Sequence, residues 1–448
     1  MTVPSQLPVS SLARGACPTL DAPMLTGDGY LSRVSLIGAI SPVQLVALCT
    51  LSERHGNGMI DISARGNLQV RGLTPTSAAA LEADVRSLAL PLREGLAVEW
   101  SPLAGLDPTA KVDPRPLGLE IMARAQHLRG SLAPKLSVVI ESCGLIRLDD
   151  LLADIRLVAT ENDGRKGWHI RLGGTARQGR VIGFVQEDQA ADCVAALLDH
   201  FATLGPRTRG RDVDPVGLPD HVSSVLVTAS SMNDISAERS HHDAFGLFDL
   251  NDGRSGMRVA LPFGQIQSRQ LKAFADMAER TGIRHVRPAP DHTLLAMGSR
   301  DACAALRAAA KTHGFITDEH DPLRQIDACP GAPSCQSARL DTHALGRFAA
   351  EEAGEFFDGS LSLHLSGCLK ACAHPTAATL VFAGTDDATH LVIQGKTTDT
   401  PAKRLFPQTE AAALSALSAL LRLERQPGET SRDCLRRLGP QRIAAALA

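Results

Sequence analysis

The sequence predicts an α+β fold in which one two-part unit is written twice. The strand-like segment 33–36 (Arg-Val-Ser-Leu) returns as 258–261 (Arg-Val-Ala-Leu), and the segment 136–140 returns as 361–365, each soon followed by a cysteine. Both comparisons give an offset of 225 residues (258 minus 33, and 361 minus 136). One shared offset indicates duplication of two parts that kept their order. Short strands mixed with helices and hairpins are typical of α+β proteins.

The first part of each unit has the pattern of a strand, a helix and a second strand. The helix is predicted over 42–54 in the first unit and over 267–280 in the second. Gly58 and Gly282 then precede the next short strand. The two copies therefore predict the same local structure.

The second part of each unit is predicted to end in a hairpin. The expected strand pairs are 155–160 with 168–172, across an Asn-Asp-Gly turn, and 378–383 with 390–394, across an Asp-Asp turn. The Ala- and Leu-rich tail from Thr409 onward predicts helices that pack on the second copy.

The bulk composition describes an ordinary globular protein with several domains. Of the 448 residues, 44% are hydrophobic and 21% are charged, and the net charge is -3. This length exceeds what one core holds, and no basic field favours nucleic acid as a partner. No apolar run approaches the roughly 20 residues that span a bilayer, and residues 1–10 lack the positive stretch followed by an apolar core that is typical of a secretion signal. We therefore expect a cytoplasmic protein with no membrane partner.

Four cysteines near the C-terminal end have the spacing of an iron–sulfur site. Cys329, Cys335, Cys368 and Cys372 follow the order C-x5-C, 32 intervening residues, C-x3-C. Two pairs of thiolates from separate segments are what a 4Fe–4S cluster needs, and such a cluster moves electrons. Zinc is the main alternative, although closed zinc sites usually draw on tighter C-x2-4-C pairs. A reducing compartment would keep these thiols available for iron.

Only the second unit carries this set of cysteines. The first unit retains Cys143 alone at the matching place, so we expect one cluster, with Cys143 packed in a core. The remaining cysteines are expected to be small buried hydrophobes; they are Cys17, Cys49, Cys193, Cys303 and Cys434.

These observations divide the chain into five expected segments. They are a half-domain over 20–110, a first α+β domain without cluster cysteines over 115–205, a crossover linker over 206–255, a second half-domain over 256–315, and a cluster-binding domain with C-terminal helices over 320–448.

The cysteine spacing and the duplication together resemble the sulfite and nitrite reductase superfamily. The resemblance implies two ferredoxin-like half-domains and two cluster- and tetrapyrrole-binding α/β domains. Within the superfamily, six stretches in order resemble the precorrin-3B synthase family. They are Arg14–Pro18, Pro23-Met24 with Thr26–Gly29, Ser63–Val70, Ser101–Pro108, Cys329–Pro333 and Ser366–Pro375.

This resemblance implies an oxidoreductase of the monooxygenase type in aerobic cobalamin biosynthesis. Such an enzyme hydroxylates precorrin-3A with dioxygen and closes an acetate arm into a lactone. The implied cofactors are the 4Fe–4S cluster and a mononuclear non-haem iron, with siroheme as the alternative tetrapyrrole. No G-x-G-x-x-G fingerprint for a nucleotide is visible, so electrons from NADH are expected to arrive through an external reductase.

The resemblance also implies where the carboxylate arms of a precorrin would be held. Arg65 matches an active-site arginine of the superfamily, and Lys135 matches one of its lysines. Arg71 and Lys370 are further candidates to hold carboxylates, while apolar walls would cover the ring faces. Each of the four has the alternative of being a solvated cation or a structural ion pair.

Three positions depart from the reductase pattern, and two of them lack an expected positive charge. Ser137 stands where a second lysine is expected, and the stretch 98–100 (Val-Glu-Trp) stands where another arginine is expected. Leu369-Lys370 replaces the Pro-Asn common between the last cysteines of the reductases. A reductase of a small anion needs a dense cationic cavity, so these departures weigh against sulfite or nitrite reduction.

Histidines near the cysteines are candidate ligands for the mononuclear iron. Two histidines and a carboxylate are the usual set for such an iron. His364 and His374 flank the last cysteine pair, with the alternative of packing beside a cluster or donating to its sulfurs. The pair His241-His242 lies in the crossover and is expected to be exposed.

Two other functions remain open from the sequence. A siroheme-dependent sulfite or nitrite reductase is the nearer alternative, and it would show strong macrocycle bands in visible light. A non-enzymatic cluster protein that carries electrons or senses iron is the third reading, although a carrier does not need a duplicated body of this size.

Overall fold

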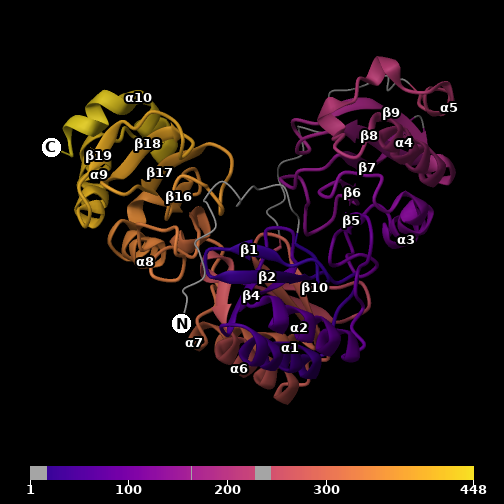
Figure 1. Cartoon of the computed structure of the whole chain (residues 1–448), viewed down its shortest axis with the longest axis horizontal. Helices are drawn as coiled ribbons and strands as arrows, with labels where there is room; N and C mark the ends of the chain where they lie inside the picture. Colours follow the sequence, from indigo (N-terminus) through magenta and orange to yellow (C-terminus); the bar gives the residue numbers. More distant parts are fainter. Residues whose placement is uncertain (1–17, 163, 228–243, 448) are drawn as a thin grey trace, which may run out of the picture.

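The computed structural model describes residues 18–162, 164–227 and 244–447. In this part of the chain four β-sheets are grouped into three lobes (Figure 1). A central lobe carries both half-domains, and the two α/β domains stand apart on either side of it. Within these ranges no helix is long and apolar enough to cross a membrane.

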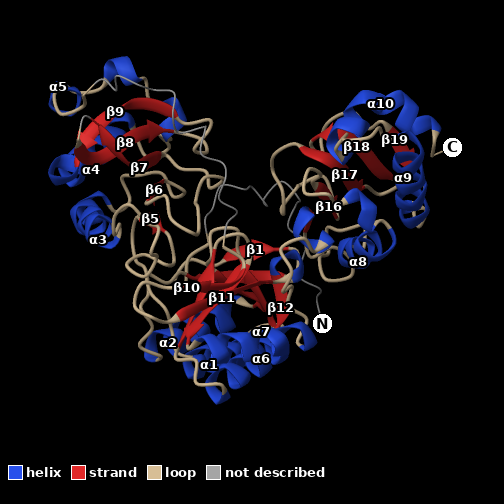
Figure 2. Ribbon diagram, turned by 180° about the vertical axis from the view of Figure 1, so that it is seen from behind, coloured by secondary structure: helices blue, strands red, loops and turns tan. Residues whose placement is uncertain are grey.

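The central lobe is built from two sheets and four long helices. Its strands are Met24–Thr26 (β1), Gly29–Val34 (β2), Met59–Ile62 (β3), Leu68–Leu73 (β4), Gly246–Asp249 (β10), Ser255–Ala260 (β11), Gln265–Gln267 (β12), His285–Ala289 (β13) and Thr293–Gly298 (β14). Its helices are Pro42–His55 (α1), Pro75–Ser87 (α2), Ser268–Arg280 (α6) and Arg300–Thr312 (α7). The sheet orders are β1-β2-β4-β3-β12 and β10-β11-β14-β13. The helices lie on the outer side of the lobe, so the strands face the two α/β domains (Figure 2).

Helix α1 shows how local sequence sets these elements. The Ser41 hydroxyl accepts from the Gln44 amide at 3.2 Å, and the Gln44 side chain accepts from the Ser41 amide at 3.0 Å. This capping box satisfies N–H groups that a helix start leaves without partners. Leu45 and Leu48 then recur at helical spacing and are buried in the core shared with α6.

The two half-domains exchange main-chain contacts reciprocally. The Ile40 amide donates to the Val286 carbonyl at 2.9 Å, and the Val286 amide donates to the Ile40 carbonyl at 2.8 Å. On the other side Ile266 of β12 pairs with Ile60 of β3. The duplication relates the two exchanges, because Ile266 corresponds to Ile40 and Val286 corresponds to Ile60, each 226 residues later (266 minus 40, and 286 minus 60), as a pseudo-twofold axis requires. An isolated bridge joins Arg65 to Pro290, its own equivalent in the other copy, and therefore lies near that axis.

Each of the two α/β domains contains a five-stranded sheet, and the two sheets have the same topology. The strands of the first are Ala97–Trp100 (β5), Ser137–Glu141 (β6), Ile155–Asn162 (β7), Arg165–Leu172 (β8) and Arg180–Gln186 (β9), and those of the second are Ile326–Ala328 (β15), Leu363–Ser366 (β16), Ala378–Gly384 (β17), Thr389–Gly395 (β18) and Lys403–Leu405 (β19). In each, three parallel strands are followed by two antiparallel ones, in sequence order. The predicted hairpins are confirmed as β7–β8 and β17–β18.

Helices cover one face of each of these sheets. They are Arg115–Arg124 (α3), Ala190–Leu204 (α4) and Asp220–Ser223 (α5) in the first domain, and Thr342–Glu352 (α8), Glu410–Glu424 (α9) and Ser431–Ala445 (α10) in the second. Thr409 is the residue at the start of α9, so the predicted tail helix is confirmed.

The segment expected to be a crossover linker contributes more structure than its composition indicates. Strand β10 lies within 206–255 and pairs with β11, so the second half-domain begins before residue 256. Val227 bonds back to Phe184 of β9 in both directions at 2.9 Å. The Gly-, Pro- and Asp-rich composition of the segment hid the short strand, because four residues are too few to show an alternating pattern.

Candidate functional site

The two cysteine pairs leave the same edge of one sheet. Cys329 follows β15 and Cys368 follows β16, and these strands are parallel neighbours. Because the carboxyl ends of parallel strands meet at one edge, both loops start side by side. The Gly367 amide donates to the Cys329 sulfur at 3.2 Å, which ties one loop to the other.

Three of the four thiols are close enough to influence one another. Burial raises the pKa of the Cys329 thiol above its usual value, and the neighbouring Cys368 and Cys335 act in the same direction. Cys329 is buried, Cys335 and Cys368 are half-buried, and Cys372 is exposed. Negative charge shared among these sulfurs would need a cation between them or donors around them.

The first cysteine loop packs tightly on the first half-domain. A Cβ added to Gly27 would lie 2.1 Å from the Cys335 sulfur, so only glycine fits at this position. The Gln336 amide also donates to the Gly27 carbonyl at 3.0 Å. Gly27, between β1 and β2, thus explains why the stretch Thr26–Gly29 belongs with the cysteine motif.

The donor chemistry of these loops fits an iron–sulfur cluster. Four thiols from two loops, a backbone N–H aimed at sulfur and a close glycine contact are what such a site uses. In the described ranges, however, no three Cys, His, Asp or Glu side chains are already arranged as a ligand set for a metal ion. The ligand role of Cys329, Cys335, Cys368 and Cys372 therefore stays a prediction.

The two histidines beside the cysteines are engaged with other groups. His374 Nδ1 lies 2.8 Å from Asp327 Oδ2, and its Nε2 lies 2.8 Å from the Thr376 hydroxyl. The hydrogen bond to Asp327 raises the pKa of His374. The ring of His364 is 5.6 Å from that of His374, centroid to centroid, and is fully buried. His241, His242, Cys17 and the stretch 14–17 lie outside the described residues.

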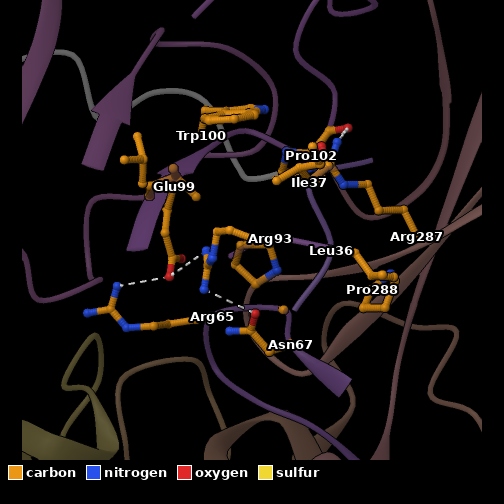
Figure 3. Close-up of a pocket in the computed structure, with 14 residues that line it drawn as sticks. Leu36, Ile37, Arg65, Asn67, Arg93, Glu99, Trp100, Pro102, Arg287 and Pro288 are labelled. Carbon is orange, nitrogen blue, oxygen red and sulfur yellow. Dashed lines mark hydrogen bonds and ion pairs between the residues drawn. The ribbon is translucent and has the colours of Figure 1, made fainter. Parts of the chain in front are cut away.

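A pocket rich in arginine lies where the first α/β domain meets both half-domains (Figure 3). Arg65 and Arg93 approach the Glu99 carboxylate from two sides, each with Nη1 at 3.4 Å from the same oxygen, Oε1. Arg65 also donates to the Leu152 carbonyl, which the Ser137 hydroxyl contacts as well. Arg65 thus lies beside the start of β6. That strand begins at Ser137, two residues after Lys135 in the sequence.

The other candidate cations have different surroundings. Lys135 is exposed just before β6, and Lys370 donates to the Ser337 hydroxyl at 3.1 Å, which links the two cysteine loops. Arg71 is buried, with a bidentate pair to Asp28 at 2.7 and 2.8 Å and a bond to Asp61 at 2.7 Å. Its guanidinium is thereby fully used as a counter-ion in this structure.

Arg71 also borders a second cavity, of about 200 Å³, between the half-domains and the first cysteine loop. His343 lines it, stacked on Phe263 with ring centroids 4.7 Å apart. Burial lowers the pKa of His343 to about 4, so this ring is neutral at physiological pH.

The sequence did not reveal Arg93 or Arg287 as members of the arginine pocket. Arg93 lies in the segment before β5, and Arg287 lies on β13 of the second half-domain. No motif joins these positions to Arg65, because only the packing of three separate segments brings them together. Glu99 was visible as a departure from the reductase pattern, but its two arginine partners were not.

Comparisons with known proteins place the chain among these relatives. Residues 22–88 match the family model of the nitrite/sulfite reductase ferredoxin-like half domain. The chain is 35% identical to "Precorrin-3B synthase" of Sinorhizobium sp over 442 residues, which is 98% of this chain and 95% of that protein. It is 21% identical to the chloroplastic ferredoxin–nitrite reductase of Arabidopsis thaliana over 78% of this chain and 66% of that one.

A solved structure has the same fold. The NirA protein of Mycobacterium tuberculosis superposes with a TM-score of 0.73 over 92% of this chain and 84% of that chain, at 18% identity. The mixed α/β architecture with two half-domains is therefore that of the nitrite and sulfite reductases. Together with the full-length match, this shows that the chain belongs to the precorrin-3B synthase family of oxidoreductases, within the nitrite and sulfite reductase superfamily.

Proposed function

We propose that the protein converts precorrin-3A to precorrin-3B, an oxygen-dependent hydroxylation with lactone formation in cobalamin biosynthesis. The observation that carries this proposal is the 35% identity to a precorrin-3B synthase along almost all of both chains. A match that extends over every domain also spans the loops, where binding residues are concentrated.

The substrate is a large ring with acetate and propionate arms. Arg65 stands at the junction of three segments with a quarter of its side chain exposed, and Lys135 is exposed nearby. Guanidinium and ammonium groups at such a junction can each take one carboxylate. We assign the binding of carboxylate arms to Arg65 and Lys135 first, and to Arg71 and Lys370 only if their present partners exchange.

The cysteine loops would hold a 4Fe–4S cluster through Cys329, Cys335, Cys368 and Cys372. A cluster bound there supplies single electrons, which dioxygen needs because its triplet state reacts slowly with a closed-shell ring. We infer that NADH delivers these electrons through a separate reductase, in the cytoplasm, where thiols stay reduced. The further iron that the family resemblance implies would draw on His364 and His374.

A siroheme-dependent sulfite or nitrite reductase is the second candidate, favoured by the matches to nitrite reductases. The arginine pocket argues against it. Glu99 neutralises part of the charge of Arg65 and Arg93, whereas reduction of a small anion needs several cations free to bind it.

The test is a single-turnover reaction with the purified, reduced protein. Anaerobic incubation with precorrin-3A, followed by isotopically labelled dioxygen, should give a product that has gained one labelled oxygen atom by mass analysis. In steady-state turnover with an added electron donor, Arg65→Gln should raise KM for the precorrin roughly tenfold, because a charge-assisted pair is lost. Arg86→Gln, an exposed arginine paired with Glu82 and Glu94, is the matched control and should leave KM unchanged.

Two outcomes would contradict the proposal. One is a reduced protein with an intact iron–sulfur spectrum that adds no oxygen to the ring. The other is strong siroheme absorbance together with turnover of sulfite or nitrite, which would support the second candidate. Efficient oxidation of NADH by the isolated protein, dependent on precorrin and oxygen, would remove the external reductase.

A further inference from the structure

We propose that Glu99 is a built-in counter-ion that closes the arginine pocket to small inorganic anions such as sulfite and nitrite. The inference deepens the proposed function, on which it rests for the identity of the large substrate. Glu99 would be a specificity-determining residue, because it decides which anions this surface accepts without taking part in the chemistry.

The pocket is an anion site by its charge balance. It measures about 30 Å³, and its charged lining consists of Arg65, Arg93, Arg287 and Glu99. Three guanidinium groups against one carboxylate leave an excess of two positive charges. A space of this size holds a water or two, or one small anionic group.

Arg287 adds to this excess because its described partners are neutral. It donates to the Pro102 carbonyl at 3.0 Å and to the Ile37 carbonyl at 3.2 Å, and no ion pair to it is present in the described ranges. Burial lowers the pKa of Arg287 to about 10, as expected for a cation held away from water without a counter-ion. An unbalanced buried charge favours an anion beside it.

Glu99 supplies one negative charge to the pocket from within the chain. Its side chain is 6% exposed and reaches the pocket from β5. The two arginines share its Oε1 at 3.4 Å, longer than the 2.7–2.9 Å usual for a charge-assisted bond. Arg65 Nη1 is buried and makes no hydrogen bond beyond this ion pair. Arg65 and Arg93 are therefore paired with Glu99, but they keep capacity to bind a further anion.

A tethered carboxylate has an advantage over a free anion. It is always present at high effective concentration, whereas a free anion loses translational freedom when it binds. Small anions make few other contacts and must compete with Glu99 on these terms alone. A macrocycle held by several arms at once does not depend on this one pocket.

Removal of the carboxylate should therefore open the pocket. In Glu99→Gln the lining gains one net positive charge without a change in shape, and in Glu99→Ala it also gains space. We expect sulfite and nitrite to bind both variants at least about tenfold more tightly than they bind the wild-type protein. In the variants the added anion no longer competes with the Glu99 carboxylate for the guanidinium groups of Arg65 and Arg93. Isothermal titration calorimetry on the full-length protein at fixed ionic strength measures this directly.

A matched control removes a carboxylate from an arginine elsewhere. Glu94→Gln breaks the exposed pair with Arg86 and should leave sulfite binding as in the wild type. Trp100 gives a second readout, because it lines the pocket while the other tryptophan, Trp168, is buried within β8. Sulfite should change the fluorescence of Trp100 in Glu99→Gln and not in Glu94→Gln.

The outcomes separate this inference from the proposed function. Equal sulfite affinity in wild type and in a folded Glu99→Gln or Glu99→Ala, judged by circular dichroism, would overturn the role of Glu99. That result would leave the oxygenation of precorrin-3A untouched. Conversely, the wild-type protein could fail to bind precorrin while the variants gain sulfite binding. That result would contradict the proposed function and would support the role of Glu99 in excluding small anions.

Discussion

The two α/β domains have sheets of the same topology, but the amides in the loop after the second strand of each sheet donate to different acceptors. In the first domain Glu141, at the end of β6, accepts the amides of Cys143 and Leu148, both at 2.7 Å. In the second domain, after β16, the Gly367 amide donates to the Cys329 sulfur. Amides of this loop thus have a carboxylate acceptor in one copy and a sulfur acceptor in the other.

This difference shows how one copy could lose its metal chemistry and stay folded. A loop amide buried without an acceptor costs free energy, so the loop needs some acceptor in either copy. Glu141 is fully buried, and burial raises its pKa. The first domain thus carries a fixed solution that depends only on the chain, whereas the second has acceptors that iron can also bind.

The largest expected effect separates the two equivalent cysteines. Cys368→Ser should abolish both the iron–sulfur absorbance and the activity, because a serine hydroxyl is a poor ligand for iron. Cys143→Ser, its counterpart 225 residues earlier, should keep both. Visible absorbance and iron content of the purified variants measure the first effect, and oxygen addition to precorrin measures the second.

Cys335→Ser extends this test to the loop that packs on Gly27 and should behave as Cys368→Ser does. Full absorbance in both serine variants would remove the cluster assignment. Loss of iron in Cys143→Ser would mean that the first copy still takes part in metal binding, and the contrast between the copies would fail.

The duplication made the fold predictable from the sequence. An offset that recurs in two places fixes the order of the elements, and turn residues such as Asn162 mark the hairpins. The reciprocal pairing of Ile40 with Val286 was not predictable, because nothing in the local sequence of either residue indicates a partner in the other half. Such long-range strand pairing depends on how whole half-domains dock.

The candidate site also has one part that the sequence predicted and one part that it did not. Cysteine spacing located the two loops, since ligands of one centre must come from a few short segments. The surroundings of Arg71 were hidden, because its acceptors Asp28 and Asp61 lie 43 and 10 residues away in sequence. Sequence identifies a cation, but only the fold decides whether a carboxylate of the chain or of a ligand lies beside it.

The next effect concerns the Glu141 carboxylate, which accepts loop amides in the first copy. Glu141→Ala should lower the free energy of unfolding by about 3 kcal/mol, because two loop amides lose their acceptor inside the protein. Ser366→Ala, at the equivalent place, removes one hydroxyl bond to the Cys368 carbonyl and should cost about 1 kcal/mol. Urea unfolding followed by circular dichroism gives both values.

Hydrogen exchange locates the damage. The amides of Cys143 and Leu148 should lose protection in Glu141→Ala, while those after β16 stay as in the wild type. Equal costs for the two substitutions would show that Glu141 is not the element that holds the first loop.

The smallest expected effect is on the pH dependence of alkylation of the Cys143 thiol. Burial first, and the nearby Glu141 second, raise the pKa of this thiol from 9.0 to about 11. Because the thiolate is the nucleophile, alkylation of the folded protein should accelerate about tenfold per pH unit from pH 8 to 10 and level off near 11. Mass analysis of the peptide that contains Cys143 gives the rate, and the same peptide in the urea-unfolded chain, with its thiol at the ordinary pKa, should level off two pH units earlier. A plateau below pH 9 in the folded protein would mean that the first copy keeps a reactive thiol, and its loop would then resemble the second more than the hydrogen bonds of Glu141 indicate.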